Sequence, residues 1–293
     1  MPAPEPEVAI DAPLVRRLLA AQHPDLADRP LDVFSEGWDN VLVRCGDDLV
    51  VRLPRREAAA RLVLHEQRWL PELAARLPLP VPVPVHSGVP GEGYPWHWSV
   101  VPWFDGAPLA HHPPDDWAAT AAALGAFLVE LHQPAPASAP DNPFRGTPLA
   151  SRTARLRTGL DAVAGTMDRY AVERAWGKLV DTPAAQEPPL WLHGDIHPLN
   201  LLVHEGRLAA VIDFGDLTAG DRATDLAAAW LVLPASVRPD FRRAAGRSRP
   251  VDDATWARAR AWALALGVAY LQGDPPLTDI GARVVAEIVA ELA

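Results

Sequence analysis

Apolar residues follow two different periods along this chain, and the change between them predicts two structural parts. Residues 12–22 carry apolar positions at helical spacing, with Pro13 suited to the first turn. Short valine-rich runs then predict three β-strands, at residues 31–34, 41–45 and 49–53. The Gly-Asp-Asp sequence at 46–48 is a turn signal that would join the last two strands as a hairpin.

One long helix and two further strands complete the first part. An amphipathic pattern over residues 56–76 predicts the helix, which should end before Pro78. Residues 80–86 and 96–101 predict the two strands. Because proline donates no ladder hydrogen bond, the prolines of the first strand place it at a sheet edge. We therefore expect a small antiparallel sheet with one inserted helix.

Beyond residue 104 the pattern becomes mainly helical. Segments rich in alanine and leucine predict six helices, at residues 115–132, 151–163, 168–181, 221–233, 252–272 and 278–291. They are interrupted by a proline-rich, exposed loop and by two short strands, at residues 133–140, 199–203 and 208–212. The predicted fold class is therefore α+β, with a β-rich part over residues 1–104 and a larger helical part over residues 105–293.

The charge balance narrows the class of partner. With 27 basic and 37 acidic residues the net charge is −10, which argues against nucleic-acid binding, where a basic footprint is expected. An acidic cleft would concentrate a cationic small substrate, although the same acidity could serve solubility alone. Only one basic residue, Lys178, is a lysine. Any other buried cation that the function needs must therefore be an arginine.

Other bulk features favour a cytoplasmic chain. The N-terminus has neither the basic region nor the apolar core of a signal peptide, so we expect none. No stretch approaches the roughly 20 apolar residues of a membrane span. Cys45 is the single cysteine, so we expect no internal disulfide and a small buried hydrophobe at this position. We expect a monomer or a weak homodimer that binds no membrane.

The residues most suited to chemistry lie between positions 191 and 216. An apolar strand leads into a polar loop that holds Asp195 and Asn200, and a hairpin follows that ends on Asp213. Phosphoryl transfer from a nucleotide needs a carboxylate to orient the attacking hydroxyl and accept its proton, together with oxygen ligands for Mg²⁺. Asp195 at the loop apex suits the first role, whereas Asn200 and Asp213 suit the second.

The same stretch resembles the aminoglycoside phosphotransferase family, whose fold is similar to that of protein kinases. The resemblance rests on His-Gly-Asp-x-x-x-x-Asn from His193 and on Ile-Asp-Phe-Gly-Asp from Ile212. Further matching segments follow in the family's order, at residues 36–40, 50–54, 65–66, 99–104 and 220–227. The resemblance implies a bilobal protein-kinase-like fold, with a nucleotide-binding lobe over residues 1–104 and a catalytic, substrate-binding lobe over residues 105–293.

Positions that match the family's motifs imply a set of site residues. Asp195 would be the catalytic base, with Asn200 and Asp213 as the Mg²⁺ ligands. Glu66 would pair with the phosphate-binding cation of the third strand, where the family commonly has lysine and this chain has Arg52. Arginine offers a planar fork, so this exchange changes the geometry and leaves ATP and GTP both open as donors. The remaining nucleotide-binding candidates come from the covering loop and the hinge: Ser35, Gly37, Asn40, Val101 and Trp103.

The resemblance also suggests supporting residues and an acceptor. His193 would brace the loop, Asp225 would accept loop backbone hydrogen bonds, and His197 could approach the metal or the substrate. The acceptor would be a hydroxylated, cationic small molecule, an aminoglycoside-type antibiotic first. Its candidate contacts are four carboxylates and three tryptophans: Asp216, Asp221, Glu287, Glu291, Trp230, Trp256 and Trp262.

Three alternatives stay open at this point. A macrolide or an amino-alcohol metabolite could be the acceptor of the same reaction. A metal-dependent hydrolase could use His193, Asp195, His197 and Asp213 as ligands, although it would leave Asn200 unexplained. A nucleotide-binding pseudokinase would account for Arg52 and for the single glycine of the covering loop.

Overall fold

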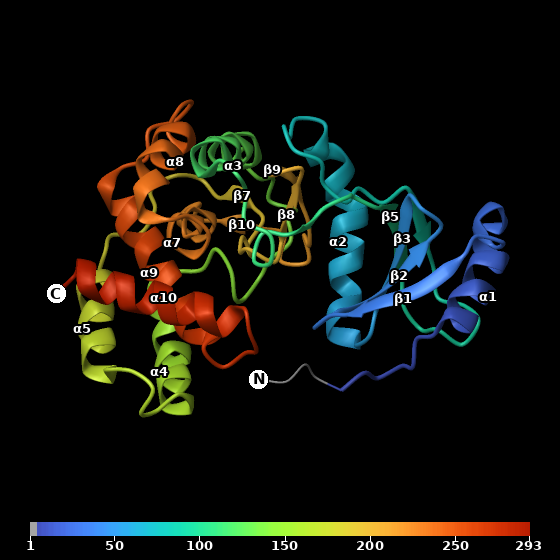
Figure 1. The fold of residues 1–293 in the computed structure, drawn as a ribbon, viewed down its shortest axis with the longest axis horizontal. Coiled ribbons are helices and arrows are strands. Elements are labelled where there is room, and N and C mark those ends of the chain that lie inside the picture. Colours follow the sequence, from blue (N-terminus) through green and yellow to red (C-terminus); the bar gives the residue numbers. More distant parts are fainter. Residues whose placement is uncertain (1–4) are drawn as a thin grey trace. The chain divides into compact units, whose positions relative to one another are not determined.

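The computed structural model describes residues 5–293, and these divide into two compact units (Figure 1). The first unit runs to Asp105 and also takes in Ala210–Gly215. The second unit comprises Gly106–Ala209 and Asp216–Ala293. The first four residues, on which the signal-peptide expectation partly falls, lie outside the described residues. The predicted α+β class is confirmed, because the sheet lies in the N-terminal region and the C-terminal part is helical.

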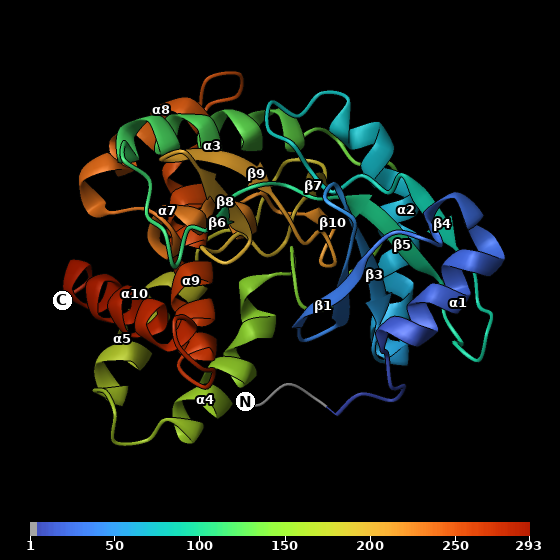
Figure 2. The same ribbon diagram turned by 45° about the vertical axis from the view of Figure 1, so that its right-hand side comes forward.

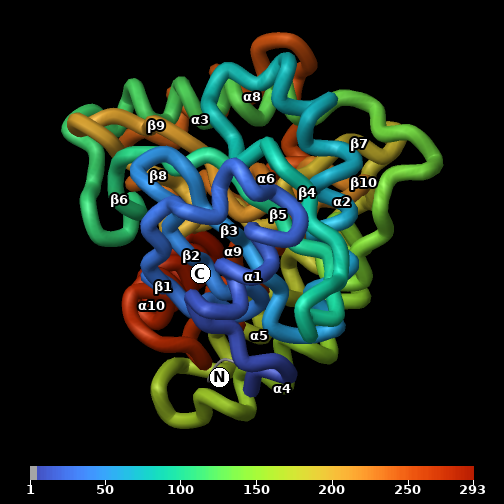
Figure 3. Tube along the Cα trace, turned by 90° about the vertical axis from the view of Figure 1, so that its right-hand side faces the viewer, coloured from blue at the N-terminus to red at the C-terminus, as the bar shows by residue number. Residues whose placement is uncertain are grey.

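The first unit contains a five-stranded antiparallel sheet. Its strands follow the order β1-β2-β3-β5-β4, which can be followed across Figure 3. Their bounds are Leu31–Glu36, Asn40–Cys45, Leu49–Pro54, Trp98–Pro102 and, for β4, His86–Gly88. The predicted hairpin joins β2 to β3 with Gly46 in the left-handed region at φ 67°. A glycine adopts this conformation without strain, which explains the turn sequence.

Two helices of the first unit pack on the sheet. Helix α1 (Ala12–Gln22) buries Leu18 and Leu19 in a core shared with β2 and β3, and Asp11 caps its N-terminus. Helix α2 (Glu57–Ala74) lies on the other face of the sheet (Figure 1). Because side chains alternate along a strand, Val51 and Leu53 face the α1 core while Arg52 faces α2. Cys45 is fully buried in the α1 core, as predicted.

The predicted strand over residues 80–86 is wrong for most of its length. Only His86–Gly88 pairs with β5, although the Val85 amide still donates to the Val100 carbonyl at 2.8 Å. Prolines at positions 80, 82 and 84 lack the amide hydrogen that a ladder requires. The short β4 lies at the sheet edge, as the prolines predicted.

The second unit is mainly helical and is built around one buried helix. Helix α9 is buried along most of its length and contacts α4, α5, α6, α7 and α10 (Figure 2). The helices span Trp117–Leu131 (α3), Thr153–Ala162 (α4), Arg169–Val180 (α5), Ala223–Leu226 (α6), Ala228–Leu231 (α7), Arg238–Ala245 (α8), Asp253–Tyr270 (α9) and Leu277–Glu291 (α10). Aspartates cap three of them, because an N-cap carboxylate accepts the free amide hydrogens of a first turn: Asp116, Asp168 and Asp252.

Two small sheets carry the polar loop of the second unit. One pairs β7 (Leu190–Leu192) with β10 (Thr218–Gly220), and the other has the order β6-β8-β9. The latter strands span Ala107–Pro108, Leu201–His204 and Arg207–Val211. The strands β6 and β10 and helix α8 were not predicted, and the helix predicted over 221–233 is two short helices, α6 and α7. No helix among the described residues is long and apolar enough to cross a membrane.

The edge of the five-stranded sheet gives a stability prediction. Gly88 lies opposite Trp98, and a Cβ added there would meet the indole ring at 1.9 Å. We expect Gly88→Ala to lower the free energy of unfolding by about 1–3 kcal/mol, because the buried Trp98 must shift. Urea denaturation followed by tryptophan fluorescence measures this change.

Gly177 is the matched control, because it is exposed on α5 and an added Cβ meets no atom within 4 Å. Gly177→Ala should raise the free energy of unfolding by about 0.5–1 kcal/mol, as expected for alanine in a helix interior. Equal stabilities for the two variants would contradict this account of the sheet edge.

Candidate active site

The polar loop between β7 and β8 is held by one buried carboxylate. The amides of His193 and Gly194 donate to Asp225 at 2.9 and 2.8 Å, and His132 Nε2 lies 3.1 Å from the same side chain. Gly194 has φ +87°, and a Cβ added there would lie 2.5 Å from the Asp216 carbonyl oxygen. The loop therefore needs glycine at this position and a charged acceptor at Asp225.

Asp195 follows directly and presents its carboxylate to two basic side chains. Arg145 Nη2 lies 2.9 Å from Oδ1, and His197 Nε2 lies 3.3 Å from Oδ2. The Asp195 amide donates to His193 Nδ1 at 3.2 Å, so His193 braces the loop. Burial alone would raise the pKa of Asp195, but Arg145 and His197 outweigh it and hold that pKa well below its ordinary value.

Asn200 is fixed beside this carboxylate. Its Nδ2 donates to the Asp195 carbonyl at 3.0 Å and lies 3.2 Å from His197 Nε2. The amide of Leu199 donates to His197 Nδ1 at 3.2 Å, so Nδ1 is occupied as an acceptor and Nε2 is the ring nitrogen that faces Asp195. Since the amide nitrogen of Asn200 points to the loop, its oxygen is the atom left to bind a cation.

The first unit holds the second group of predicted residues. Arg52 Nη1 lies 3.1 Å from both carboxylate oxygens of Glu66, and Arg52 Nη2 lies 3.5 Å from Asp213 Oδ1. Burial opposes the charge of Arg52, but the two carboxylates outweigh burial and raise its pKa, so Arg52 stays protonated. Asp213 is half exposed and has a left-handed backbone, φ 63°. Such backbone strain is frequent at functional positions.

The predicted covering loop is a tight β1–β2 connection. The Gly37 amide donates to the Asn40 carbonyl at 2.9 Å, and Arg55 Nη1 donates to the Gly37 carbonyl at 2.9 Å. Ser35 lies on β1 opposite Leu42. The loop is thus closed by one backbone hydrogen bond and anchored by Arg55, the residue that follows β3.

At the predicted hinge, Val101 is buried opposite Val50, whereas Trp103 is partly exposed. The guanidinium of Arg44 lies over the Trp103 ring, 3.5 Å from its centroid, and the Phe34 ring packs against it in a T-shaped arrangement with centroids 5.4 Å apart. Trp103 therefore has one ring face covered by a cation within the first unit.

The predicted acceptor contacts are engaged with arginines. Closest ion-pair distances are 3.0 Å for Asp216–Arg145, 2.6 Å for Asp221–Arg258, 2.6 Å for Glu287–Arg238 and 2.9 Å for Glu291–Arg238. The three predicted tryptophans, Trp230, Trp256 and Trp262, are buried in the helical core. These positions therefore carry neutralised charges and packed rings.

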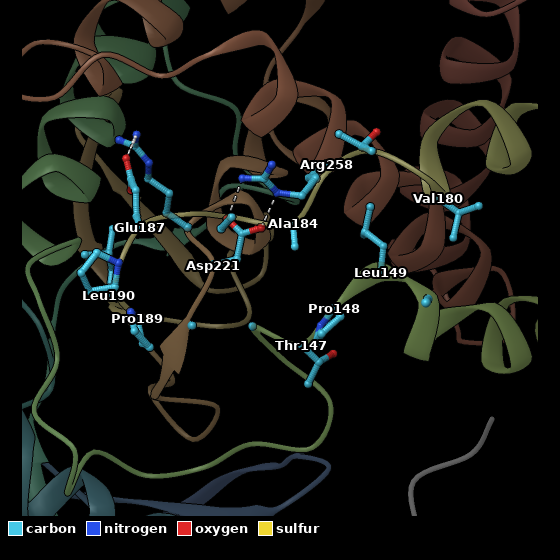
Figure 4. Close-up of a pocket in the computed structure, with 17 residues that line it drawn as sticks. Thr147, Pro148, Leu149, Val180, Ala184, Glu187, Pro189, Leu190, Asp221 and Arg258 are labelled. Carbon is cyan, nitrogen blue, oxygen red and sulfur yellow. Dashed lines mark hydrogen bonds and ion pairs between the residues drawn. The ribbon is translucent and has the colours of Figure 1, made fainter.

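A pocket of ≈ 380 Å³ opens in the second unit (Figure 4). The ion pair of Asp221 with Arg258 and that of Glu187 with Arg222 lie on its wall, and the remaining lining is mostly proline, alanine and leucine. Of the predicted site residues, the pocket contains Asp221 alone. The pocket is therefore separate from the Asp195 carboxylate.

The hydrolase alternative finds little support in the loop. Nδ1 of His193 and Nδ1 of His197 both accept backbone amides, which removes two nitrogen lone pairs from metal binding. Among residues 5–293, no three His, Cys, Asp or Glu side chains gather into a metal-binding cluster. Asn200 and Asp213 offer oxygen atoms, the donor type that Mg²⁺ prefers.

Sequence comparison identifies the family. The model of the phosphotransferase enzyme family matches residues 31–262. This chain belongs to that family and is a small-molecule kinase. The predicted family and enzyme class are thereby confirmed. Among curated protein sequences, none matches this chain significantly.

Solved structures show the same fold at low sequence identity. Aminoglycoside 2'-phosphotransferase-IIIa in its GDP complex is 20% identical over 97% of this chain and 100% of its own, with a TM-score of 0.74. Macrolide 2'-phosphotransferase MphH from Brachybacterium faecium is 20% identical over 94% and 98%, with a TM-score of 0.62. A streptomycin–ATP complex of APH(2")-IIa is 18% identical over 94% and 95%, with a TM-score of 0.59. The predicted kinase-like fold is confirmed.

The buried Asp225 gives a second stability prediction. Asp225→Asn removes the charge that accepts two loop amides and turns an amide nitrogen towards one of these donors. We expect the free energy of unfolding to fall by about 2–4 kcal/mol, since a buried hydrogen-bonded charge is lost. Urea denaturation measures the loss.

Asp161→Asn serves as its control, because Asp161 forms an exposed ion pair with Arg169. That change should cost no more than about 0.5 kcal/mol. A similar loss in both variants would show that Asp225 does not hold the loop.

Proposed function

We propose that this chain transfers the γ-phosphoryl group of ATP or GTP to a hydroxyl of a small molecule, with Asp195 as the catalytic carboxylate. The observation that carries the proposal is the fixed, ionised Asp195, held by Arg145 and His197 on a loop that Asp225 anchors. Membership of the phosphotransferase enzyme family supports the reaction class.

In this reaction the acceptor oxygen attacks the γ-phosphorus while the bond to the β–γ bridging oxygen breaks. The nucleoside diphosphate leaves, and the hydroxyl proton passes to Asp195. Because the pKa of Asp195 is depressed, its main contribution would be to orient the hydroxyl and accept the proton late. A loose transition state, in which the acceptor needs little activation, suits such a weak base.

The donor side would use the residues of the first unit. Arg52, paired with Glu66, would contact phosphate oxygens with its second nitrogen. Ser35, Gly37 and Asn40 would cover the phosphates, and Val101 with Trp103 would border the base. Structures of similar proteins are described as GDP and ATP complexes, which supports a nucleotide donor.

The residues that would hold Mg²⁺ are Asn200 and Asp213. A hard cation takes oxygen ligands, and both side chains supply them. When bound, Mg²⁺ would neutralise charge on the transferred phosphates. The protein's own contribution in the second unit is to hold Asn200 and Asp195 in fixed orientations on one loop.

The acceptor is a hydroxylated small molecule, and two antibiotic classes are candidates. Net acidity favours an aminoglycoside, the class named for several similar structures. The arginine partners of Asp216, Asp221 and Glu287 favour a less cationic compound, such as a macrolide. Macrolide phosphotransferases are also among the similar structures.

A transfer assay tests the role of Asp195. Mg-ATP and Mg-GTP are screened against aminoglycosides, macrolides and amino alcohols, with product measured for the wild type and Asp195→Ala. We expect the variant to lose at least ~10²-fold in rate, in line with general-base contributions. Asp240→Ala, which removes a carboxylate from the surface of α8, should retain activity. Equal product from the wild type and Asp195→Ala would refute the assignment.

The buried pair in the first unit gives a kinetic prediction. Glu66→Gln keeps the size of the side chain but removes the charge that orients Arg52. We expect the KM for the nucleotide to rise about tenfold, which corresponds to about 1.4 kcal/mol, with the acceptor KM unchanged. Steady-state kinetics with each substrate varied in turn measures both KM values. A higher KM for the acceptor with an unchanged KM for the nucleotide would show that Glu66 serves the acceptor.

A further inference from the structure

Arg145 occupies a cation position beside the candidate catalytic carboxylate. One nitrogen, Nη2, lies 2.9 Å from Asp195 Oδ1 and 3.0 Å from Asp216 Oδ2. Asn142, from the same loop between α3 and α4, donates to Asp216 Oδ1 at 2.7 Å. The guanidinium therefore bridges two carboxylates that would otherwise repel each other.

The loop that carries Arg145 is fixed to the sheet beneath the polar loop. Gly146 has φ +66°, and its amide donates to Thr224 Oγ1 at 3.2 Å. A Cβ at Gly146 would lie 2.9 Å from Leu192 Cδ1 and 3.1 Å from Gly220 Cα. This close packing against β7 and β10 holds Arg145 in place, so its position does not depend on a flexible loop.

Within residues 5–293, two buried polar atoms of this cluster lack hydrogen-bond partners. Among the described residues, the buried atoms Arg145 Nε and Tyr270 Oη have no hydrogen-bond partner. The Tyr270 ring contacts that of His197, with centroids 5.8 Å apart, so its hydroxyl belongs to the same cluster. Burial opposes the charge of Arg145, but Asp195 and Asp216 outweigh it and raise its pKa. Arg145 is therefore a permanent positive charge within this cluster.

We propose that Arg145 is a specificity-determining residue that disfavours an ammonium group next to the reacting hydroxyl of the acceptor. The proposal rests on the proposed function, in which that hydroxyl binds Asp195. An ammonium on the neighbouring carbon would then lie near a fixed guanidinium of the same sign. Like-charge juxtaposition of this kind is how binding sites reject a wrong partner.

Arg145, Asp195 and Asp216 together carry a net charge of −1, so the repulsion acts at short range from the guanidinium, and each nearby carboxylate already has an arginine partner. Asp216 is already bonded to Arg145 and Asn142, and Asp221 is bonded to Arg258. An incoming cation would have to displace an arginine before it could bind either carboxylate. The preferred acceptor is therefore a hydroxyl compound whose positive charges, if any, lie away from the reacting hydroxyl.

A pair of probes, compared between protein variants, reports this charge effect. Kanamycin and its fully N-acetylated derivative share skeleton and hydroxyls, but acetylation replaces each ammonium with a neutral and larger amide, so the change in their ratio between variants is the readout. Isothermal titration calorimetry with the full chain gives the ratio of their dissociation constants, kanamycin over N-acetylated. We expect Arg145→Gln to lower this ratio at least about tenfold through tighter kanamycin binding, because a like charge is removed. Arg145→Lys, which keeps the charge, should leave the ratio within about threefold of the wild type.

Two further variants keep the test decisive. Arg243→Gln removes an exposed arginine of α8 with the same change in net charge and should leave the ratio unchanged. If Arg145→Gln fails to fold, the double variant Arg145→Gln with Asp216→Asn removes one of the two carboxylates left to repel each other, and it is compared with Asp216→Asn alone so that only the Arg145 charge differs. The proposal would be overturned if the ratio of dissociation constants for Arg145→Gln equalled that of the wild type. It would also be overturned if Arg145→Lys lowered the ratio as much as Arg145→Gln does.

Parallel transfer assays with Asp195→Asn separate the two claims. If transfer survived this change, the proposed function would fail. If transfer depended on Asp195 while the binding ratio ignored Arg145, only the inference about Arg145 would fail.

Discussion

The carboxylate of Asp225 is the interaction on which the candidate active site most depends. It is fully buried on α6 and gathers the amides of His193 and Gly194, with His132 beside it. These contacts fix a loop that only glycine can complete at position 194, and the next residue is Asp195. Because a buried charge without donors would be strongly unfavourable, the loop and the helix stabilise each other. The position of Asp195, the candidate base, thus depends on the hydrogen bonds of Asp225, a residue that is not proposed to contact the substrate.

Arginine is the second constraint on the site. The chain has a single lysine, and the buried Arg52, Arg238 and Arg258 and the half-buried Arg145 each form ion pairs with carboxylates. Planar guanidinium forks hold such pairs in defined geometries. The net charge of −10 therefore does not translate into free carboxylates at the predicted acceptor positions. The net charge of the chain and the local charge of the site are separate properties. The local charge determines which groups are available to bind an acceptor.

Local sequence signals predicted much of the fold. Residues 12–22 form a helix with the predicted bounds, since one apolar stripe with a proline in the first turn suffices to define it. The ordered family motifs predicted the loop and the pairing of Arg52 with Glu66.

Local sequence signals failed at positions where tertiary contacts determine the structure. The segment 80–86 has the apolar pattern of a strand, but its prolines lack the amide donors that a strand needs. The apolar run 221–233 forms two short helices, α6 and α7, in place of one. Arg145 was missed because it lies in an irregular segment and contacts Asp195 50 residues away.

The central claim is that Asp195 acts in the chemical step of phosphoryl transfer. A single-turnover experiment tests it most directly, with enzyme in excess over Mg-nucleotide, a saturating acceptor and rapid quenching. The account predicts that Asp195→Asn slows product formation at least ~10²-fold while the affinities for nucleotide and acceptor change little. A single-turnover rate in the variant equal to that of the wild type would contradict the account.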